Sequence, residues 1–129
     1  MLSKMKHLHI NIYDLGKSGK GPISFGPPWG FHMKIEEAQE MMRKVYWERD
    51  KARGVKETLQ RTEEELAELG VAILEIEGIK AIENEIADVF AWLCSLANLL
   101  EVDVSTAFYN KYPDVCSKCK QSPCTCPDS

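Results

Sequence analysis

Two short acidic runs in this 129-residue chain have residue types and a spacing that could hold a divalent cation. The first run contains Glu64, Glu65 and Glu68, and the second contains Glu85 and Asp88. If the runs are helical, residues three positions apart lie on the same side, about one turn from each other. Each run then presents two carboxylates side by side, and carboxylate oxygens are the ligands that Mg²⁺ prefers.

The sequence around these runs predicts that both lie on helices. Apolar residues recur at helical spacing in four stretches, with glycine or proline at their ends. Gly54 breaks the first stretch and Gly78 ends the second, whereas Asp103 is a good N-cap for the fourth, which Pro113 stops. We therefore expect an all-α fold whose four-helix core spans about residues 35–51, 56–77, 79–100 and 104–112.

The position of the acidic residues relative to the apolar stripes decides what they could bind. Glu65 falls at the margin of the second helix's stripe, Glu68 lies just outside it, and Glu64 points largely the other way. Glu85 and Asp88 border the stripe of the third helix. Four carboxylates would thus meet where the two helices pack, and burying like charges is costly unless a cation binds them. Bound Mg²⁺ could polarise the phosphoryl oxygens of a triphosphate and lower the pKa of an attacking water.

The acidic residues and a glycine-rich stretch also admit other interpretations. Glutamate is a strong helix former, so a Glu-rich run such as that around Glu64 is usually a solvated helix face. A di-iron carboxylate bundle is set aside, because no histidine follows Glu65 or Glu85 at the Glu-x-x-His spacing. The stretch Gly16–Gly21 is not a phosphate-binding loop, because Pro22 stands where that motif has lysine.

Composition and length narrow the class of protein. A net charge of −4 argues against a broad nucleic-acid-binding surface, and no apolar run is long enough to span a membrane. No apolar stretch follows the basic N-terminal residues as it would in a signal peptide, so we expect a cytoplasmic protein. The length corresponds to one domain with a thin core, so burial against a second subunit would be unsurprising.

The chain divides into three parts. Residues 1–32 are rich in glycine, proline and lysine, with room for one short strand at His9–Tyr13, and they are predicted to be a flexible or non-native extension. Residues 33–112 would form the helical domain, and residues 113–129 a cysteine-rich tail.

Four of the five cysteines lie in this tail, as Cys116, Cys119, Cys124 and Cys126. Four soft thiolates are the set that Zn²⁺ takes in closed structural sites, so the tail is predicted to be a zinc knuckle. The short Cys-x-Cys spacing departs from the usual ribbon pattern, and disulfide or redox pairing and an unliganded mobile tail stay open as alternatives. Cys94, in an apolar helix, is expected to be a small buried residue.

The pattern Glu64-Glu65-x-x-Glu68 followed by Glu85-x-x-Asp88, within EEELAELGVAIL and ENEIADVFAWLCSLANLLEVDVSTAFYNKY, resembles the MazG-like family of all-α nucleoside triphosphate pyrophosphohydrolases. The resemblance covers about residues 35–126. It implies Mg²⁺-dependent hydrolysis of a (deoxy)nucleoside triphosphate to the monophosphate and pyrophosphate, with Mn²⁺ as an alternative ion, in house-cleaning of the nucleotide pool. It also implies that Glu65, Glu68, Glu85 and Asp88 hold the metal and that Glu64 and Glu65 are the catalytic candidates.

The resemblance further implies substrate contacts and an assembly. Lys111 would contact phosphate and Trp92 would lie near the nucleotide, and Trp47 and Arg53 are looser candidates together with Arg49 and Asp50. The alternative for Lys111 is a solvated surface lysine, and the alternative for Trp92 is ordinary core or subunit packing. For the looser candidates the alternative is a surface salt bridge. A homodimer or homotetramer is expected. The rival interpretation of the whole chain is a non-catalytic helical adaptor whose zinc-stapled tail engages a partner.

Overall fold

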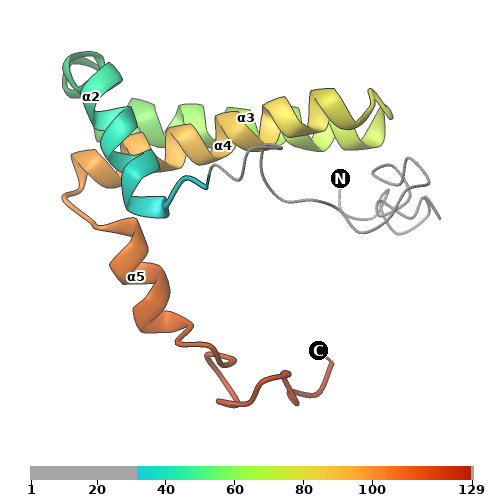
Figure 1. The fold of residues 1–129 in the computed structure, drawn as a ribbon. Helices are drawn as coiled ribbons and strands as arrows, with labels where there is room; N and C mark the ends of the chain where they lie inside the picture. Colours follow the sequence, from blue (N-terminus) through green and yellow to red (C-terminus); the bar gives the residue numbers. More distant parts are fainter. Residues whose placement is uncertain (1–31, 129) are drawn as a thin grey trace.

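The computed structural model describes residues 32–128, and Figure 1 shows their arrangement. This range contains four helices and no strand: α2 (Ile35–Arg53), α3 (Val55–Leu74), α4 (Ile79–Leu99) and α5 (Val104–Lys111). The prediction of an all-α fold is therefore confirmed. The strand considered at His9–Tyr13 lies outside the described residues, as does the predicted extension apart from His32. No helix in the described range is long and apolar enough to cross a membrane.

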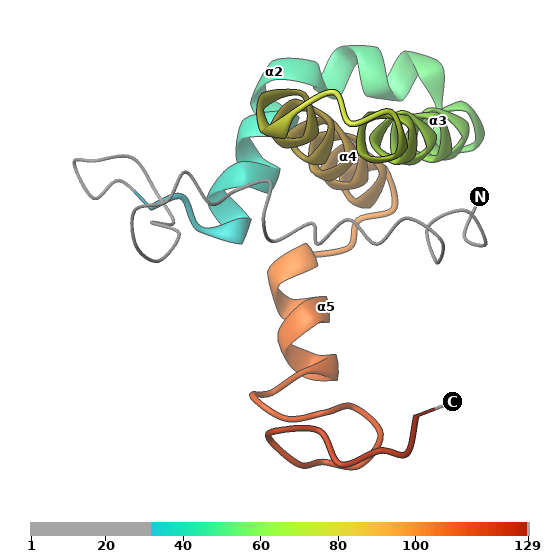
Figure 2. The same ribbon diagram turned by 90° about the vertical axis from the view of Figure 1, so that its right-hand side faces the viewer.

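Helices α3 and α4 form an antiparallel hairpin, and α2 crosses one end of it (Figures 1 and 2). The most extensive helix contact joins α3 to α4, and the next joins α2 to α4. Small residues line these contacts: Ala72 on α3 and Cys94 and Ala97 on α4 are buried, beside the larger Ile82. Small side chains let helix backbones approach closely, so polar residues at the margins of the hairpin are brought near one another.

Two glycines make the sharp bends between helices. Gly54 has φ 84° and ψ 169°, and Gly78 has φ 100° and ψ 163°. This backbone region is essentially restricted to glycine. Gly54 ends α2 and starts α3, since its N–H donates to the Asp50 carbonyl and its own carbonyl accepts from the Thr58 N–H. The predicted break at Gly54 is confirmed.

The prediction that the second helix runs to Gly78 is wrong, because α3 ends at Leu74. The chain leaves α3 through a Schellman turn, in which the Glu77 N–H donates to the Ala72 carbonyl at 3.2 Å. Ile76 takes the left-handed position of this turn with φ 53°. Glycine usually marks that position, and here a β-branched residue occupies it, so the sequence carries no stop signal. Gly78 instead caps the start of α4.

A cluster of hydrogen bonds fastens the α4–α5 turn to α2. Asn98 is 3% exposed, and its side-chain oxygen accepts from Gln39 Nε2 at 3.0 Å. Gln39 also donates to the Val102 carbonyl at 2.8 Å and accepts from the Val104 N–H at 2.9 Å. The predicted cap of α5 is confirmed, because the Asp103 carboxylate accepts from the backbone N–H at the third helical position. Beyond this turn α5 projects away from the hairpin (Figures 1 and 2).

The single chain leaves much of its apolar surface uncovered. Leu66 and Ile86, which belong to the apolar stripes of the second and third predicted helices, are 59% and 53% exposed. The reason is geometric: a two-helix hairpin crossed at one end has too few elements to cover both of its faces. Further large apolar side chains exposed on these two helices and in the turn between them are Val55, Leu59, Val71, Ile76, Ile79, Phe90 and Leu93.

We expect Gly78→Ala to lower the free energy of unfolding by about 1–3 kcal/mol, the usual cost of a strained backbone conformation. A Cβ atom placed at Gly78 meets nothing within 4 Å, so the effect would come from the backbone and not from a clash. Urea unfolding at fixed protein concentration would measure it. Lys80→Ala, on the exposed first turn of α4, is the matched control and should change stability little. Equal stability of the Gly78 variant and wild type would contradict the role assigned to this glycine.

Candidate active site

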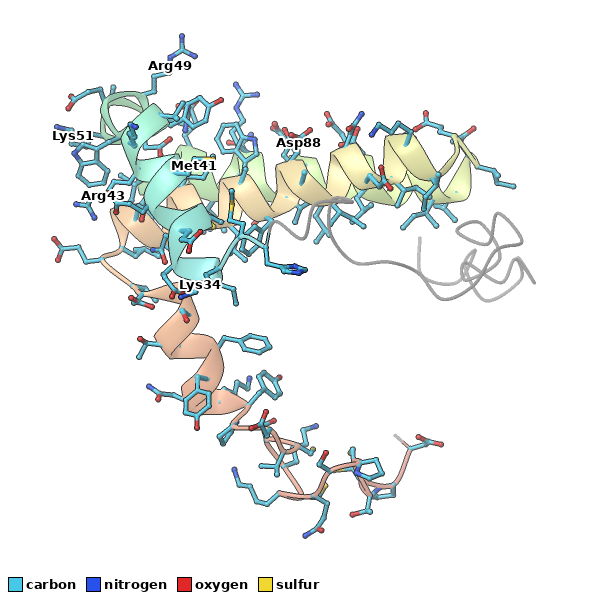
Figure 3. The ribbon with its side chains drawn as sticks, viewed as in Figure 1. Lys34, Met41, Arg43, Arg49, Lys51 and Asp88 are labelled. Atoms are coloured by element: carbon cyan, nitrogen blue, oxygen red, sulfur yellow. The ribbon has the colours of Figure 1, made fainter. Side chains whose placement is uncertain are left out.

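The structure brings three glutamates together at the α3–α4 contact. Glu65 and Glu68 lie on α3 and Glu85 on α4, and one carboxylate oxygen from each lies within 4.8 Å of the others. Asp88 lies three residues after Glu85 on α4, and its charge is close enough to raise the pKa of both Glu65 and Glu85. Figure 3 shows the Asp88 side chain on the face of the hairpin where several carboxylates point outward.

The helix register explains why Glu65 and Glu85 are half-buried. Glu65 lies seven residues after Thr58 and seven before Ala72, both of which are fully buried. A spacing of seven is two helical turns, so Glu65 shares the face by which α3 packs on α4. Glu85 follows the buried Ile82 by three residues. Glu65 therefore lies nearer the centre of the helix contact than its predicted place at the edge of an apolar stripe.

The electrostatics of this cluster favour a bound cation. Burial raises the pKa of Glu65 and of Glu85, and the nearby Glu68 and Asp88 carboxylates raise both further. Glu65 Oε2 and Glu85 Oε2 are shielded from solvent and accept no hydrogen bond. Within residues 32–128 no lysine or arginine forms an ion pair with any of the four carboxylates.

The donor set fits Mg²⁺. Octahedral Mg²⁺ with oxygens at about 2.1 Å places neighbouring ligand oxygens about 3 Å apart and opposite ones about 4 Å apart. One oxygen each of Glu65, Glu68 and Glu85 lies within 4.8 Å of the others, so a small side-chain movement would bring them to these separations.

A cavity of about 190 Å³ opens next to the carboxylates, between α2 and α4. Asp88 lines the cavity and is close enough to the glutamates for its charge to raise the pKa of Glu85, so the cavity and the cluster adjoin. Inside the cavity the Arg53 guanidinium lies 4.5 Å from the centre of the Trp92 ring and donates to Asp50 Oδ1 at 2.9 Å. The lining consists of residues from both helices: Met42, Tyr46, Arg49, Asp50, Arg53, Asp88, Ala91, Trp92 and Ser95.

The family model described as the MazG nucleotide pyrophosphohydrolase domain matches residues 53–121. This match covers more than half of the chain and includes α3, α4 and all four carboxylates of the cluster. The chain belongs to the MazG family. A search of proteins with curated functions found no match. Membership indicates a nucleotide pyrophosphohydrolase, and the carboxylate cluster beside a cavity is the part of this MazG chain that could perform that chemistry.

Sequence reasoning misjudged one part of the cavity. Asp50 and Arg53 do form the salt bridge that was expected as the alternative to substrate contact, but it does not lie on the surface: Asp50 is 1% exposed and its Oδ2 accepts no hydrogen bond. The sequence holds a signal for this burial, because Asp50 continues the spacing of Met42 and Tyr46 along one face of α2. An aspartate at the end of an apolar face is a candidate for a buried polar group that faces a ligand.

Three predicted site residues are not brought to the cluster within one chain. Glu64 forms an ion pair with Arg61 at 3.3 Å on the exposed side of α3. Trp47 does not line the cavity. The Arg43 guanidinium lies 4.5 Å from its ring centre, on the side of α2 that faces away from Asp88 (Figure 3). Lys111 lies at the end of the projecting α5.

The four tail cysteines do come together. Their sulfur atoms all lie within 4.8 Å of one another, and none forms a disulfide. Backbone hydrogen bonds, first that from Thr125, lower the pKa of the Cys119 thiol to about 5, whereas the neighbouring thiols raise the pKa of Cys126 to about 11. Cys94 is buried as expected, and burial raises the pKa of its thiol.

In EDTA at pH 7 we expect Glu85→Gln to melt at a higher temperature than wild type, because it removes one of the crowded charges. A glutamate whose pKa is raised in the folded state contributes stability below 4.5, its ordinary pKa, and that stability is lost as the pH rises through the raised pKa. The advantage of the variant should therefore shrink as the pH falls toward 4.5. Thermal unfolding between pH 5 and pH 8 would measure it.

The exposed Glu83→Gln is the matched control, and its melting temperature should follow that of wild type at every pH. Added Mg²⁺ should raise the melting temperature of wild type and of the control. The increase should be much smaller for Glu85→Gln, which lacks one of the proposed ligands. A variant that melts below wild type in EDTA at pH 7 would contradict the charge crowding described above.

Proposed function

We propose that this chain hydrolyses a (deoxy)nucleoside triphosphate to the monophosphate and pyrophosphate, with Mg²⁺ or Mn²⁺ held by Glu65, Glu68, Glu85 and Asp88. The observation that carries the proposal is the pair of shielded oxygens, Glu65 Oε2 and Glu85 Oε2, which lack any hydrogen-bond donor. Such acceptors are costly unless a ligand satisfies them, and a hard cation does so directly. When bound, the cation neutralises phosphate charge and lowers the pKa of a coordinated water.

The cavity is the proposed place of the nucleoside. The Trp92 ring and the Arg53 guanidinium offer flat surfaces on which a nucleobase can stack. Asp88 stands between the cavity and the glutamates, so a nucleotide whose base lies against Trp92 would direct its phosphates toward the carboxylate cluster. This arrangement favours a nucleotide over an inorganic polyphosphate, which would leave the cavity unused.

Of the two catalytic candidates, Glu65 is the better placed to orient the attacking water. It lies within the cluster, and its raised pKa brings it closer to the working pH of a general base. Glu64 is instead paired with Arg61 on the exposed side of α3. Glu65→Gln is therefore expected to lose far more activity than Glu64→Gln.

A homodimer is the proposed assembly, with a homotetramer as the larger alternative. Its support is the apolar surface of α3 and α4, on which the side chains of Leu66, Ile86 and Leu93 are exposed in the single chain. A second copy that covered this surface would supply the burial that a chain of this size lacks. In the cell we propose house-cleaning of the cytoplasmic nucleotide pool, with no nucleic acid or membrane as partner.

Pyrophosphate release from a panel of ribo- and deoxynucleoside triphosphates is the test of the reaction. We expect release with Mg²⁺ and none in EDTA, with the monophosphate as co-product. Asp88→Asn and Glu68→Gln should each lose roughly 100-fold or more, since misplacing reacting groups by about 1 Å costs that much. Glu83→Gln is the control that should keep full activity.

Release of orthophosphate in place of pyrophosphate would contradict the proposed bond cleavage. If folded protein releases nothing with Mg²⁺ or Mn²⁺ from any member of the panel, the alternative of a non-catalytic helical adaptor is favoured.

Trp92→Ala should raise KM for the best substrate more than it lowers kcat, because stacking holds the base in substrate and transition state alike. Loss of a base–aromatic stack worth about 1–3 kcal/mol corresponds to a rise in KM of roughly 5- to 150-fold. Trp92→Phe should recover part of the loss. Trp47→Ala is the matched control, since that ring contacts the cationic groups of Arg43 and Lys51 and does not line the cavity. Equal effects of the two alanine variants would argue against the cavity as the base site.

A further inference from the structure

The cysteine-rich tail has the sulfur geometry of a closed metal site. Cys116 Sγ and Cys126 Sγ are 3.7 Å apart, and Cys119 Sγ and Cys124 Sγ are 3.9 Å apart. A tetrahedral Zn²⁺ with four Zn–S bonds of about 2.3 Å places its sulfurs about 3.8 Å from one another. A disulfide needs its two sulfurs about 2 Å apart, which neither of these two close pairs approaches. The four-way convergence therefore fits a single cation better than pairwise oxidation.

The backbone around the sulfurs is arranged as it is around metal-bound thiolates. Three backbone N–H groups, each at 3.4 Å, point at sulfur: Lys118 to Cys116, Thr125 to Cys119 and Cys126 to Cys124. Amide donors stabilise negative charge on sulfur and orient it toward a metal. These hydrogen bonds come from both cysteine pairs, so the two halves of the tail are organised toward one point.

The first cysteine pair sits in a closed turn. The Lys120 N–H donates to the Cys116 carbonyl at 3.0 Å, and the Cys116 N–H donates to the Gln121 carbonyl at 3.0 Å. Lys120 has φ 61°, a left-handed conformation that costs free energy in a residue other than glycine. Something in the tail must offset this cost.

Apolar packing does not offset it. No residue between Pro113 and Asp128 is buried, and only Val115 among the aliphatic side chains is even half-buried. A segment this short without a core needs a cross-link or a metal to hold one conformation. The MazG match also stops at residue 121, between the two cysteine pairs, so it does not span the cluster.

We propose that Cys116, Cys119, Cys124 and Cys126 bind one structural Zn²⁺ and that this ion, not apolar packing, folds the tail. Four thiolates fill the tetrahedral coordination and leave no open position, so the site has no catalytic role. On binding, each thiol that is still protonated gives its proton to the solvent, and four Zn–S bonds form. The inference is independent of the proposed function, because the cysteines share no residue with the carboxylate cluster.

The first experiment is metal analysis of the full chain purified without chelator. We expect about one zinc per chain, and loss of that zinc in Cys119→Ser/Cys124→Ser, which removes one ligand from each cysteine pair. Cys94→Ala is the matched control, since this buried cysteine lies in α4, and it should keep its zinc. Four freely reacting tail thiols without metal, disulfide-bonded tails, or iron in place of zinc would each overturn the proposal.

Limited trypsin digestion gives a second readout. Lys118 and Lys120 are exposed within the knuckle, and the bound metal should hold their backbone out of a protease's reach. Cleavage at these lysines should be slow in wild type and in Cys94→Ala, and faster by tenfold or more in Cys119→Ser/Cys124→Ser. Equal rates in all three proteins would contradict a metal-dependent fold.

The two metal sites can be tested separately. EDTA is expected to remove both ions, but activity that returns with Mg²⁺ alone reports on the carboxylates. Zinc content and protection from trypsin report on the cysteines. An inactive protein that still holds one zinc would contradict the proposed reaction but support the zinc site. An active protein that holds no zinc would support the reaction and contradict the zinc site.

Discussion

The crowding of carboxylates at the contact of α3 and α4 is the constraint on which the rest of the structure depends. Glu65 shares a helix face with two fully buried residues, Thr58 and Ala72, and Glu85 approaches it from the facing helix. No basic side chain in the described range neutralises them. Burial and mutual repulsion both disfavour their charged forms, which makes the cluster a poor stabiliser of the apo protein and a strong ligand for a dication. The proposed metal site would exchange folding stability for binding, and the helix hairpin must be held together by other contacts.

Those other contacts also shape the substrate side of the site. Gly54 turns the chain so that α2 crosses the end of the hairpin, and the crossing forms the cavity beside Asp88. Gln39 and Asn98 fasten the start of α2 to the α4–α5 turn, which fixes the angle of the crossing. The cavity and the carboxylates thus adjoin along α4, and the proposed nucleotide could contact both. The tail also lacks a hydrophobic core, since none of its residues between Pro113 and Asp128 is buried. There the proposed zinc ion would take the place of apolar packing.

Much of the local structure follows from residue patterns, and the departures have identifiable causes. The helices, the break at Gly54 and the cap at Asp103 were predicted because periodicity and capping act over a few residues. The end of α3 was missed because Ile76, not a glycine, takes the left-handed position. Asp50 was assigned to the surface because burial of an aspartate depends on what α4 places against α2. Periodicity left open whether Leu66 and Ile86 pack within one chain or against a second subunit, because a stripe shows that a surface is covered but not which chain covers it.

The sequence by itself determined the helices, the two carboxylate pairs and the soft character of the tail, since each rests on residue type and short-range spacing. Only the tertiary structure decided that the carboxylates of Glu65, Glu68 and Glu85 converge, whereas Glu64 forms an ion pair with Arg61. It also decided that Arg53 and Trp92 meet in a cavity whereas Trp47 and Lys111 lie elsewhere. The physical reason is that periodicity specifies the face of a helix on which a residue lies, whereas the crossing angle and register of packed helices specify what that face meets.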